Sequence, residues 1–178
     1  MAIKVIITDG DPLLRQKSKE VVEITDRTIK LLDNMVETMR DAEGVGLAAI
    51  QISHPLRIAV VDVGDGLVEL INPELVECKD EQTGLEGCLS VPGLYGRVTR
   101  SNTIIVKALN REGKETLINA EGFFARAILH EMDHMDGKLF TDLAEETYDA
   151  EMIQAEVAKE RAEISTKNEP EESDEQQL

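Results

Sequence analysis

The first half of the chain shows a helical spacing of apolar residues in two places. Asp11 followed by Pro12 is typical of a helix start and predicts a short helix that runs to about Lys19. Residues 26–42 carry apolar side chains at intervals of three and four, and Gly44 ends the pattern, which predicts a longer helix. We expect the apolar face of this helix to pack in the core through Ile29, Leu32, Val36 and Met39.

Four runs rich in β-branched residues predict strands that pair as two hairpins. Residues 56–63 and 67–71 are separated by a short turn with two glycines. Residues 103–109 and 115–118 are separated by a turn that ends at Gly113. Because each pair is joined by so short a connection, the strands of each hairpin should be antiparallel.

Two more helices are predicted after these strands. The first runs from about Gly122 to Asp136 and is ended by Gly137. The second spans roughly residues 142–165 and shows a weaker apolar stripe that begins at Tyr148. The pattern therefore predicts an α+β fold, in which antiparallel strands wrap around the first of these two helices as a central helix.

The length of the chain predicts one compact domain with an appendage. A chain of 178 residues can bury a core of its own, and we expect the main domain to span residues 1–145. A C-terminal helix over residues 146–165 and an acidic tail over 166–178 should follow. Residues 142–178 contain 13 acidic and 3 basic residues, a net charge of −10. The last part has almost no apolar residues, which predicts a disordered tail.

Charge, hydropathy and cysteine content exclude several classes of protein. The net charge of −17 disfavours non-specific binding to nucleic acids or to anionic membranes. No apolar run approaches the roughly 20 residues that cross a bilayer, and the first residues lack the layout of a signal or transit peptide. Two cysteines cannot form a disulfide framework, so we expect a reducing, cytoplasmic environment.

The strongest chemical signal is a pair of histidines on the expected central helix. His130 and His134 are four residues apart, with Glu131 between them. Residues at this spacing share one face of a helix, so both imidazoles can bind one metal ion. Glu131 lies close enough to handle the protons of a metal-bound water. The alternative is an ordinary helix with polar residues on a partly exposed face, and a third ligand would distinguish the two.

Cys88 is the best-placed candidate for that third ligand. Catalytic metal sites usually have three protein ligands and one open position. His54 lies in an expected loop, and we interpret it as a surface histidine. Cys78 lies among charged residues at the end of an expected strand, where nothing requires a thiolate. Cys88 follows Gly87 in a turn, where a cysteine on its own is more often a small buried apolar residue.

Three separated segments of the chain match the motifs of one family. They are Gly44-Val45-Gly46-Leu47-Ala48-Ala49-Ile50-Gln51, Glu86-Gly87-Cys88-Leu89-Ser90 and His130-Glu131-Met132-Asp133-His134. In this order and at these separations they resemble the peptide deformylase family, and the resemblance covers about residues 1–145. One such motif alone would be a weak signal, whereas the three together are close to diagnostic.

The chemistry of the candidate residues agrees with this resemblance. A thiolate and two imidazoles suit Fe(II), Co(II), Ni(II) or Zn(II) better than Mg(II) or Ca(II). A water in the open position would have a lowered pKa, and Glu131 could take its proton and deliver it to a leaving amine. The side-chain amide of Gln51 and the backbone N–H of Leu89 could stabilise an oxyanion. The resemblance implies the same roles for the matching residues, with Cys88, His130 and His134 as the metal ligands.

The resemblance also implies a substrate and a native metal. The metal is expected to be one ferrous ion per chain, for which Zn(II), Ni(II) or Co(II) can substitute. The reaction removes the formyl group from the N-terminal formylmethionine of nascent polypeptides. The stretch Gly44, Val45 and Gly46 permits close backbone approach, either to a bound peptide as substrate-binding residues or to a neighbouring strand.

The acidic C-terminus departs from part of the family pattern. In some bacterial members the C-terminal helix is basic and docks on the ribosome, whereas here its cations are only Lys159, Arg161 and Lys167. Ribosome association by that route is therefore disfavoured. We expect a monomer whose partners are nascent formylmethionyl peptides, with no direct binding of nucleic acid or membrane.

Two other functions are compatible with the histidine motif alone. A His-Glu-x-x-His zinc endopeptidase would normally complete its site with a histidine or carboxylate further along the chain, and it would leave the first two motifs unexplained. A structural zinc site would usually be closed by four protein ligands, and the sequence offers three good ones.

Overall fold

The computed structural model describes residues 2–167, apart from the side chains of Glu160 and residues 164–167. The strands are β1 (Gly46–Ala48), β2 (Ile58–Val61), β3 (Val68–Cys88), β4 (Val91–Leu109), β5 (Glu115–Glu121) and β6 (Glu146–Asp149). The α-helices are α1 (Asp26–Asp41), α2 (Gly122–Met135) and α3 (Ala150–Lys167), and the 3₁₀-helices are η1 (Pro12–Arg15), η2 (Ala49–Ile52) and η3 (Phe140–Asp142).

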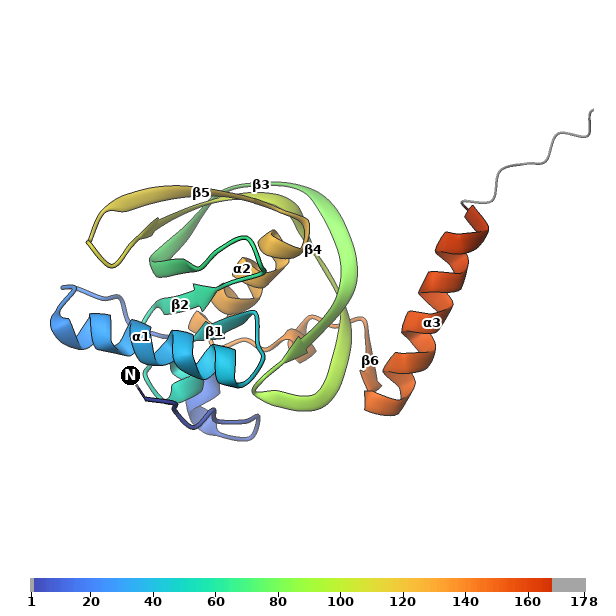
Figure 1. The fold of residues 1–178 in the computed structure, drawn as a ribbon, viewed down its shortest axis with the longest axis horizontal. Helices are drawn as coiled ribbons and strands as arrows, with labels where there is room; N and C mark the ends of the chain where they lie inside the picture. The colour runs from blue at the N-terminus through green and yellow to red at the C-terminus, as the bar shows by residue number, and fades with distance from the viewer. Residues whose placement is uncertain (1, 168–178) are drawn as a thin grey trace, which may run out of the picture.

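The strands of this region form one antiparallel sheet that curves around α2. Their order is β1-β2-β3-β4-β5, and β6 pairs with β4 beside this path. Figure 1 shows the long strands β3 and β4 bending over α2, while α1 lies across β1 and β2. The predicted α+β fold with strands around a central helix is therefore confirmed.

Two apolar layers hold the helices to the sheet. On one side, Ala125 and Ile128 of α2 pack with Leu70, Val106 and other buried residues of the strands. On the other side, the apolar face of α1 packs against β1 and β2 through Leu32, Met35 and Met39. Burying such side chains contributes roughly 1.5–3 kcal/mol each, so both helices are held mainly by packing. The methionines of α1 are core residues, as predicted.

The ends of α1 follow the predicted signals. Before the helix, the backbone N–H of Thr25 donates to Thr28 Oγ1 at 3.2 Å, which satisfies a donor at the N-terminus. After the helix, Glu43 has a φ of 53° and Gly44 N–H donates to the Met39 carbonyl at 2.9 Å. The chain thus turns sharply and enters β1 at Gly46, which leads from the helix into the candidate site.

Both predicted hairpins are present, and the structure adds a long third hairpin between β3 and β4 that was not predicted. The strand pairs β2–β3 and β4–β5 match the predicted turns. The prediction missed the remainder of β3 and β4, which pair along most of their length and meet in a turn at Leu89 and Ser90. The outer part of β3 is mostly polar and exposed, so it has no alternating apolar pattern.

Two predicted helices differ from the structure. The helix predicted from Asp11 to Lys19 is only the single turn η1, although Asp11 caps it as expected, with its side chain accepting from Leu13 N–H at 2.9 Å. The helix predicted over residues 142–165 is wrong in its first part, because Tyr148 belongs to β6 and the helix begins at Ala150. The register of β6 places Tyr148 opposite Tyr95 of β4, so pairing with an existing strand overrides local helix preference there.

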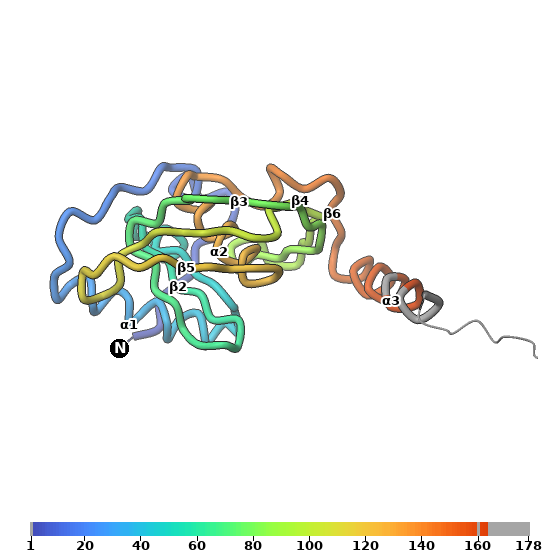
Figure 2. Tube along the Cα trace, turned by 90° about the horizontal axis from the view of Figure 1, so that it is seen from above, coloured from blue at the N-terminus to red at the C-terminus, as the bar shows by residue number. Residues whose placement is uncertain are grey.

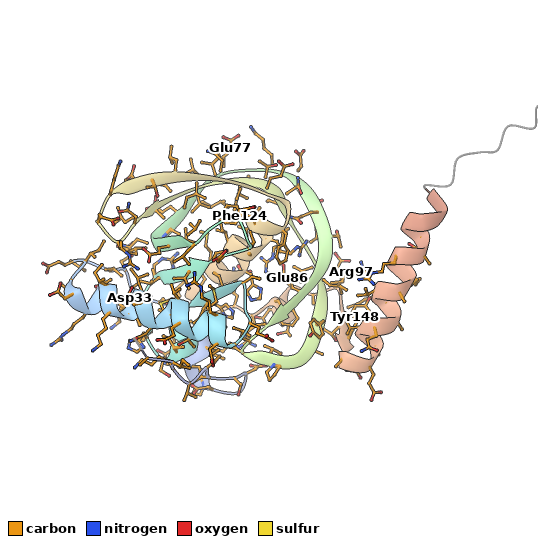
Figure 3. The ribbon with its side chains drawn as sticks, in the orientation of Figure 1. Asp33, Glu77, Glu86, Arg97, Phe124 and Tyr148 are labelled. Carbon is orange, nitrogen blue, oxygen red and sulfur yellow. The ribbon has the colours of Figure 1, made fainter. Side chains whose placement is uncertain are left out.

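The C-terminal region extends away from the rest of the chain. Figure 2 shows α3 leading off beyond β6, and Figure 3 labels Arg97 and Tyr148 where the strands meet this helix. Arg97 forms an ion pair with Glu156 of α3 at 2.8 Å. Thr166 and Lys167 belong to α3, and the rest of the predicted acidic tail lies outside the described residues. None of the described helices is long and apolar enough to cross a bilayer.

Candidate functional site

Helix α2 places the two motif histidines on one face, one turn apart. The ring centroids of His130 and His134 are 5.0 Å apart and their planes are nearly perpendicular. The helix sits inside the curved sheet because its opposite face is apolar and buried, through residues such as Ala125 and Ile128. The two imidazoles are therefore held on a rigid element in the interior, as a metal site requires.

The end of β3 brings Cys88 to these histidines. Its Sγ lies 3.3 Å from Nε2 of His134, and one ligand atom from each of Cys88, His130 and His134 lies within 4.8 Å of the others. The turn that follows β3 restrains the thiol, because the backbone N–H of Ser90 donates a hydrogen bond to the Cys88 sulfur at 3.4 Å. Three residues from two distant parts of the chain thus converge as a group that can hold a metal ion.

Unsatisfied atoms in the same place fit a metal site. Among the described residues, His134 Nδ1 and Glu131 Oε2 are two of only four buried side-chain nitrogen and oxygen atoms without a hydrogen-bond partner. Buried polar atoms are nearly always bonded, so the unpartnered Glu131 Oε2 beside the cavity indicates a site that a bound group completes. The unpartnered Nδ1 of His134 is not the ring nitrogen that faces Cys88, which is Nε2. A thiolate and two imidazoles are donors typical of borderline first-row divalent metals.

Burial sets the protonation of the histidines and of Glu131. Burial, together with the charge of His130, holds the pKa of His134 well below its usual value, so its imidazole stays neutral and able to bind a metal. Burial also raises the pKa of the Glu131 carboxyl to about 7. A carboxyl group with that pKa can both accept and donate a proton near neutral pH.

His130 is oriented by a buried carboxylate that the sequence reasoning did not single out. Glu86 accepts a hydrogen bond from His130 Nδ1 at 2.9 Å, which leaves Nε2 free to face Cys88 and His134. Burial opposes charge on the His130 ring, but the bonds to Cys88 and Glu86 outweigh it and raise its pKa to about 10. A metal at Nε2 therefore competes with a proton, while Glu86 keeps the ring in place in either state.

Glu86 is in turn held by two buried arginines. Arg100 donates to both of its oxygens, from Nε at 2.5 Å and from Nη2 at 2.9 Å, and Arg126 Nη1 donates to Oε1 at 2.7 Å. Arg100 also pairs with Asp133 of α2 at 2.8 Å. Burial alone would raise the pKa of Glu86, but the bonds from Arg100 and His130 lower it to about 2, so the group stays ionised. Figure 3 shows Glu86 in the interior, beside α2.

Gln51 reaches the site from η2. Its Oε1 accepts from Ala48 N–H at 2.8 Å, and its Nε2 donates to Ser90 Oγ at 3.0 Å and lies 3.7 Å from Cys88 Sγ. The side-chain amide is thus fixed at both ends with its N–H₂ group towards the thiol. Leu89 follows Cys88 directly, so its backbone N–H is next to the same centre.

A cavity of about 420 Å³ joins most of these residues. Of the predicted site residues, it is lined by Gly44, Val45, Gly46, Gln51, Cys88, Leu89, His130 and Glu131. Its remaining walls include apolar side chains, among them Leu85, Leu94 and Phe123. A concave, mainly apolar site with a few convergent polar groups is typical of a ligand pocket. His134 is not among the residues that line the cavity, and its exposed fraction is 1%.

The rejected candidates lie apart from this cavity. His54 is exposed and its Nδ1 is bonded to the Ile52 carbonyl at 2.8 Å. Cys78 is exposed on β3. The residues that the sequence reasoning missed are Glu86, Ser90, Arg100 and Arg126. Glu86 and Ser90 lie inside a matched motif, which was the available signal, whereas nothing in the local sequence marks the two arginines.

The sequence and the structure both resemble known proteins. Residues 3–150 match the sequence model of the polypeptide deformylase family. The peptide deformylase of Natranaerobius thermophilus is 55% identical over 150 residues, which is 83% of this chain and 96% of that protein. The peptide deformylase of Halothermothrix orenii is 58% identical over 135 residues, which is 75% of this chain and 88% of that protein.

Solved structures extend the likeness to the fold. The crystal structure of peptide deformylase from Thermotoga maritima superimposes with a TM-score of 0.80 at 38% identity, over 82% of this chain and all of that one. The peptide deformylase of Synechococcus elongatus in complex with actinonin gives a TM-score of 0.77 at 37% identity, over 79% of this chain and 78% of that one. The endopeptidase interpretation is therefore not favoured, and this chain belongs to the polypeptide deformylase family.

Proposed function

We propose that Cys88, His130 and His134 bind one ferrous ion per chain, at the centre that carries out the deformylase reaction. As a peptide deformylase, the protein uses water to cleave the amide between a formyl group and an N-terminal methionine, releasing formate and a free amine. The observation that carries the ligand assignment is the convergence of three ligand atoms within 4.8 Å, beside the unpartnered carboxylate oxygen of Glu131. When bound, such a metal supplies a Lewis acid that lowers the pKa of a coordinated water and polarises a carbonyl oxygen.

In this proposal Glu131 is the proton carrier. Its carboxylate is buried beside His130, and the cavity reaches it. With a pKa of about 7 it can take a proton from the attacking water and pass it to the leaving nitrogen, so that a neutral amine and formic acid result. Formic acid then ionises to formate, and its proton goes to the amine or to solvent. Because burial raises the pKa, a larger fraction of this carboxyl carries a proton near neutral pH than an exposed glutamate would, and its carboxylate is a stronger base.

Gln51 and Leu89 are the proposed oxyanion donors. The negative charge that develops on the formyl oxygen needs N–H groups already aimed at it. The Gln51 side chain cannot turn away, because Ala48 and Ser90 hold its two ends. The backbone N–H of Leu89 is fixed by the turn that connects β3 to β4.

Gly44, Val45 and Gly46 form the proposed rim for the peptide backbone. All three residues line the cavity, where their backbone can contact a bound peptide. The absence of a side chain at Gly44 and Gly46 makes room for Leu89 and Glu131 beside that backbone. Gly46 belongs to β1, which already pairs with β2, so the alternative of close approach to a neighbouring strand also applies to that residue. An unbranched methionine side chain suits the apolar walls of the cavity.

The finer points about the metal and the setting are also proposals. A mixed thiolate–imidazole donor set suits Fe(II), Zn(II), Ni(II) and Co(II) alike, and the resemblance to the family favours ferrous iron as the native metal, with the other three as substitutes. Nascent formylmethionyl peptides are made in the bacterial cytoplasm, and the bacterial origin of the relatives supports that location. On α3, acidic residues outnumber the basic ones, which include Lys159 and Arg161. A helix that is not basic is poorly suited to the ribosome, so docking through α3 is disfavoured.

A formyl-peptide assay with metal analysis tests this function. We expect efficient hydrolysis of formyl-Met-Ala-Ser, much weaker action on acetyl-Met-Ala-Ser, and no cleavage of unmodified casein. Acetyl should be rejected because its extra methyl group would need space beside the three proposed ligands, where Gly46 and Cys88 both line the cavity. Protein purified without oxygen should contain one iron per chain. Cleavage of casein with formyl peptides left intact would overturn the proposal in favour of an endopeptidase.

A further inference from the structure

Arg126 is a buried arginine that no step of the reaction described above uses. Its side chain is 5% exposed, and it lies on α2 four residues before His130, hence on the same helix face. Its Nη1 donates to Glu86 Oε1 at 2.7 Å and to the Val98 carbonyl at 2.9 Å, and its Nη2 donates to the Gln82 carbonyl at 3.3 Å. One guanidinium thus ties α2 to both strands of the β3–β4 hairpin.

These bonds meet at the carboxylate that holds a proposed metal ligand. The Oε1 atom of Glu86 receives Arg126 and the Nε of Arg100, while Oε2 receives Arg100 Nη2 and His130 Nδ1. A carboxylate held at both oxygens by a single arginine can still tilt with that arginine. A second donor at Oε1, from another element, removes this freedom.

Arg100 by itself does not provide the same restraint. It is shared between Glu86 and Asp133, whose carboxylate receives Arg100 Nη1 at 2.8 Å. Its position therefore follows that of Asp133 on α2 as well as that of Glu86. Arg126 has a different set of anchors, because its remaining bonds go to the backbone carbonyls of Gln82, Gly84 and Val98, which are part of a paired hairpin.

Arg126 also borders the cavity. It lines the same space as Phe123, Ala127 and His130, which come from the same helix. The guanidinium is directed at the hairpin, where a Cβ added to Gly84 would lie 3.3 Å from Nη2. The part of Arg126 next to the cavity is therefore its aliphatic stem, a rigid apolar wall because its far end is anchored.

We propose that Arg126 is a positioning residue, which fixes Glu86 and through it the ring of His130, while its stem forms part of the wall of the cavity. The inference rests on the proposed roles of His130 and of the metal. It gives the protein a direct link between the pocket wall and a metal ligand. Substituting a residue that hydrogen-bonds a metal-binding side chain, without itself touching the metal, usually lowers metal affinity or activity by about 10- to 100-fold.

The substitution Arg126→Met tests this role, because it keeps an unbranched apolar stem and removes the guanidinium. We expect kcat for formyl-Met-Ala-Ser to fall about 10- to 100-fold, with KM and the preference for methionine nearly unchanged. Arg111→Met is the matched control. Arg111 also binds two carboxylates, Glu69 and Asp33, but lines a different hollow, so its loss should leave both constants unchanged.

A double-mutant cycle separates positioning from general stability. If Arg126 acts through Glu86, the effects of Arg126→Met and Glu86→Gln on kcat should not multiply, since the first has nothing left to position in the second background. Multiplicative effects, or an unchanged kcat in Arg126→Met measured well below its melting temperature, would overturn the proposal. Where Arg126→Met fails to fold, Arg126→Lys carries the same test, because lysine retains the charge but cannot bond all of these partners.

A spectroscopic readout that does not depend on activity completes the test. In zinc-loaded protein labelled with ¹⁵N-histidine, the Nδ1–H signal of His130 should shift in Arg126→Met and remain in place in Arg111→Met. An unshifted signal would refute the positioning role. If instead no histidine signal responds to zinc in the unsubstituted protein, the ligand assignment itself is wrong, which is distinguishable from a failure of Arg126.

Discussion

Gly46 and Glu131 lie so close together that a Cβ added to Gly46 would overlap the carboxylate of Glu131. Gly46 begins β1 and Glu131 is in the middle of α2, so this contact joins two of the three matched motifs. The glycine is needed for space rather than for an unusual backbone angle, since it has no positive φ. It allows strand and helix to approach until the proposed proton carrier faces the cavity.

Gly46→Ala should therefore impair catalysis without removing the metal. The added methyl group displaces the Glu131 carboxylate, and a misplacement of about 1 Å can cost about 10²-fold in rate. Steady-state kinetics and metal content of the purified variant provide the measurement. Gly44→Ala is the control in the same loop: its Cβ would lie 2.7 Å from Leu89 Cδ1, the end of a side chain that can rotate, so we expect a smaller loss. Equal losses in the two variants would contradict this reasoning.

Each of the three proposed ligands should be required for metal binding. Cys88→Ala, His130→Ala and His134→Ala each remove one of three converging donors, so stoichiometric metal and activity should both be lost. Glu131→Ala should retain metal and lose about 10²- to 10⁴-fold in turnover, because only the proton carrier is removed. Elemental analysis beside kinetics checks both. Cys78→Ser, at an exposed cysteine, should behave like the unsubstituted protein, and full activity in Cys88→Ala would disprove the ligand assignment.

Gln51→Leu should lower kcat by about 10²- to 10³-fold through loss of an oxyanion donor. The change also leaves Ala48 N–H without its partner, so thermal melting must be recorded to place the assay well below the transition. Ser90→Ala is the comparison, because it removes the acceptor of Gln51 Nε2 but keeps the amide, and should cost less. A loss in Ser90→Ala as large as that in Gln51→Leu would show that the hydrogen-bonded pair, not the amide, matters.

The iron-loaded protein should lose activity in air or peroxide, while nickel- or cobalt-loaded protein should not. Oxidation of ferrous iron or of the Cys88 thiolate would account for the loss. Half-lives in air and under nitrogen provide the measurement. Cys78→Ser should be as sensitive as the unsubstituted protein, which would exclude oxidation of the exposed thiol as the cause. Equal half-lives in air and nitrogen, with zinc as the metal found, would refute the iron assignment.

Local sequence patterns predicted those parts of the chain in which one element buries a regular apolar face. Helices α1 and α2 and the two hairpin turns follow from such patterns, and α2 brings His130 and His134 to one face by its period alone. Cys88 was selected by the need for a third donor and by the family resemblance. The structure places its sulfur 3.3 Å from His134 Nε2, and its role as a metal ligand stays a prediction.

The remaining features arise from contacts between segments far apart in the chain. The polar outer half of β3 forms a strand because it pairs with β4, and Tyr148 is in a strand because β6 pairs with that same β4. The outer half of β3 is mostly polar, and β6 has one buried side chain, Tyr148, so neither segment has a regular apolar pattern in the sequence. Pairing with β4 therefore decides their strand structure.

The chain's own motifs thus determined the family, the metal-binding residues to examine and the central helix that carries two of them. Only the tertiary structure decided how those residues are held. Arg100 and Arg126 lie 14 and 40 residues from Glu86, and both are unremarkable charges in the sequence. Curvature of the sheet around α2 buries all three side chains together, where ionised groups are stable only when paired. Because of that burial, two ordinary arginines support a proposed metal ligand.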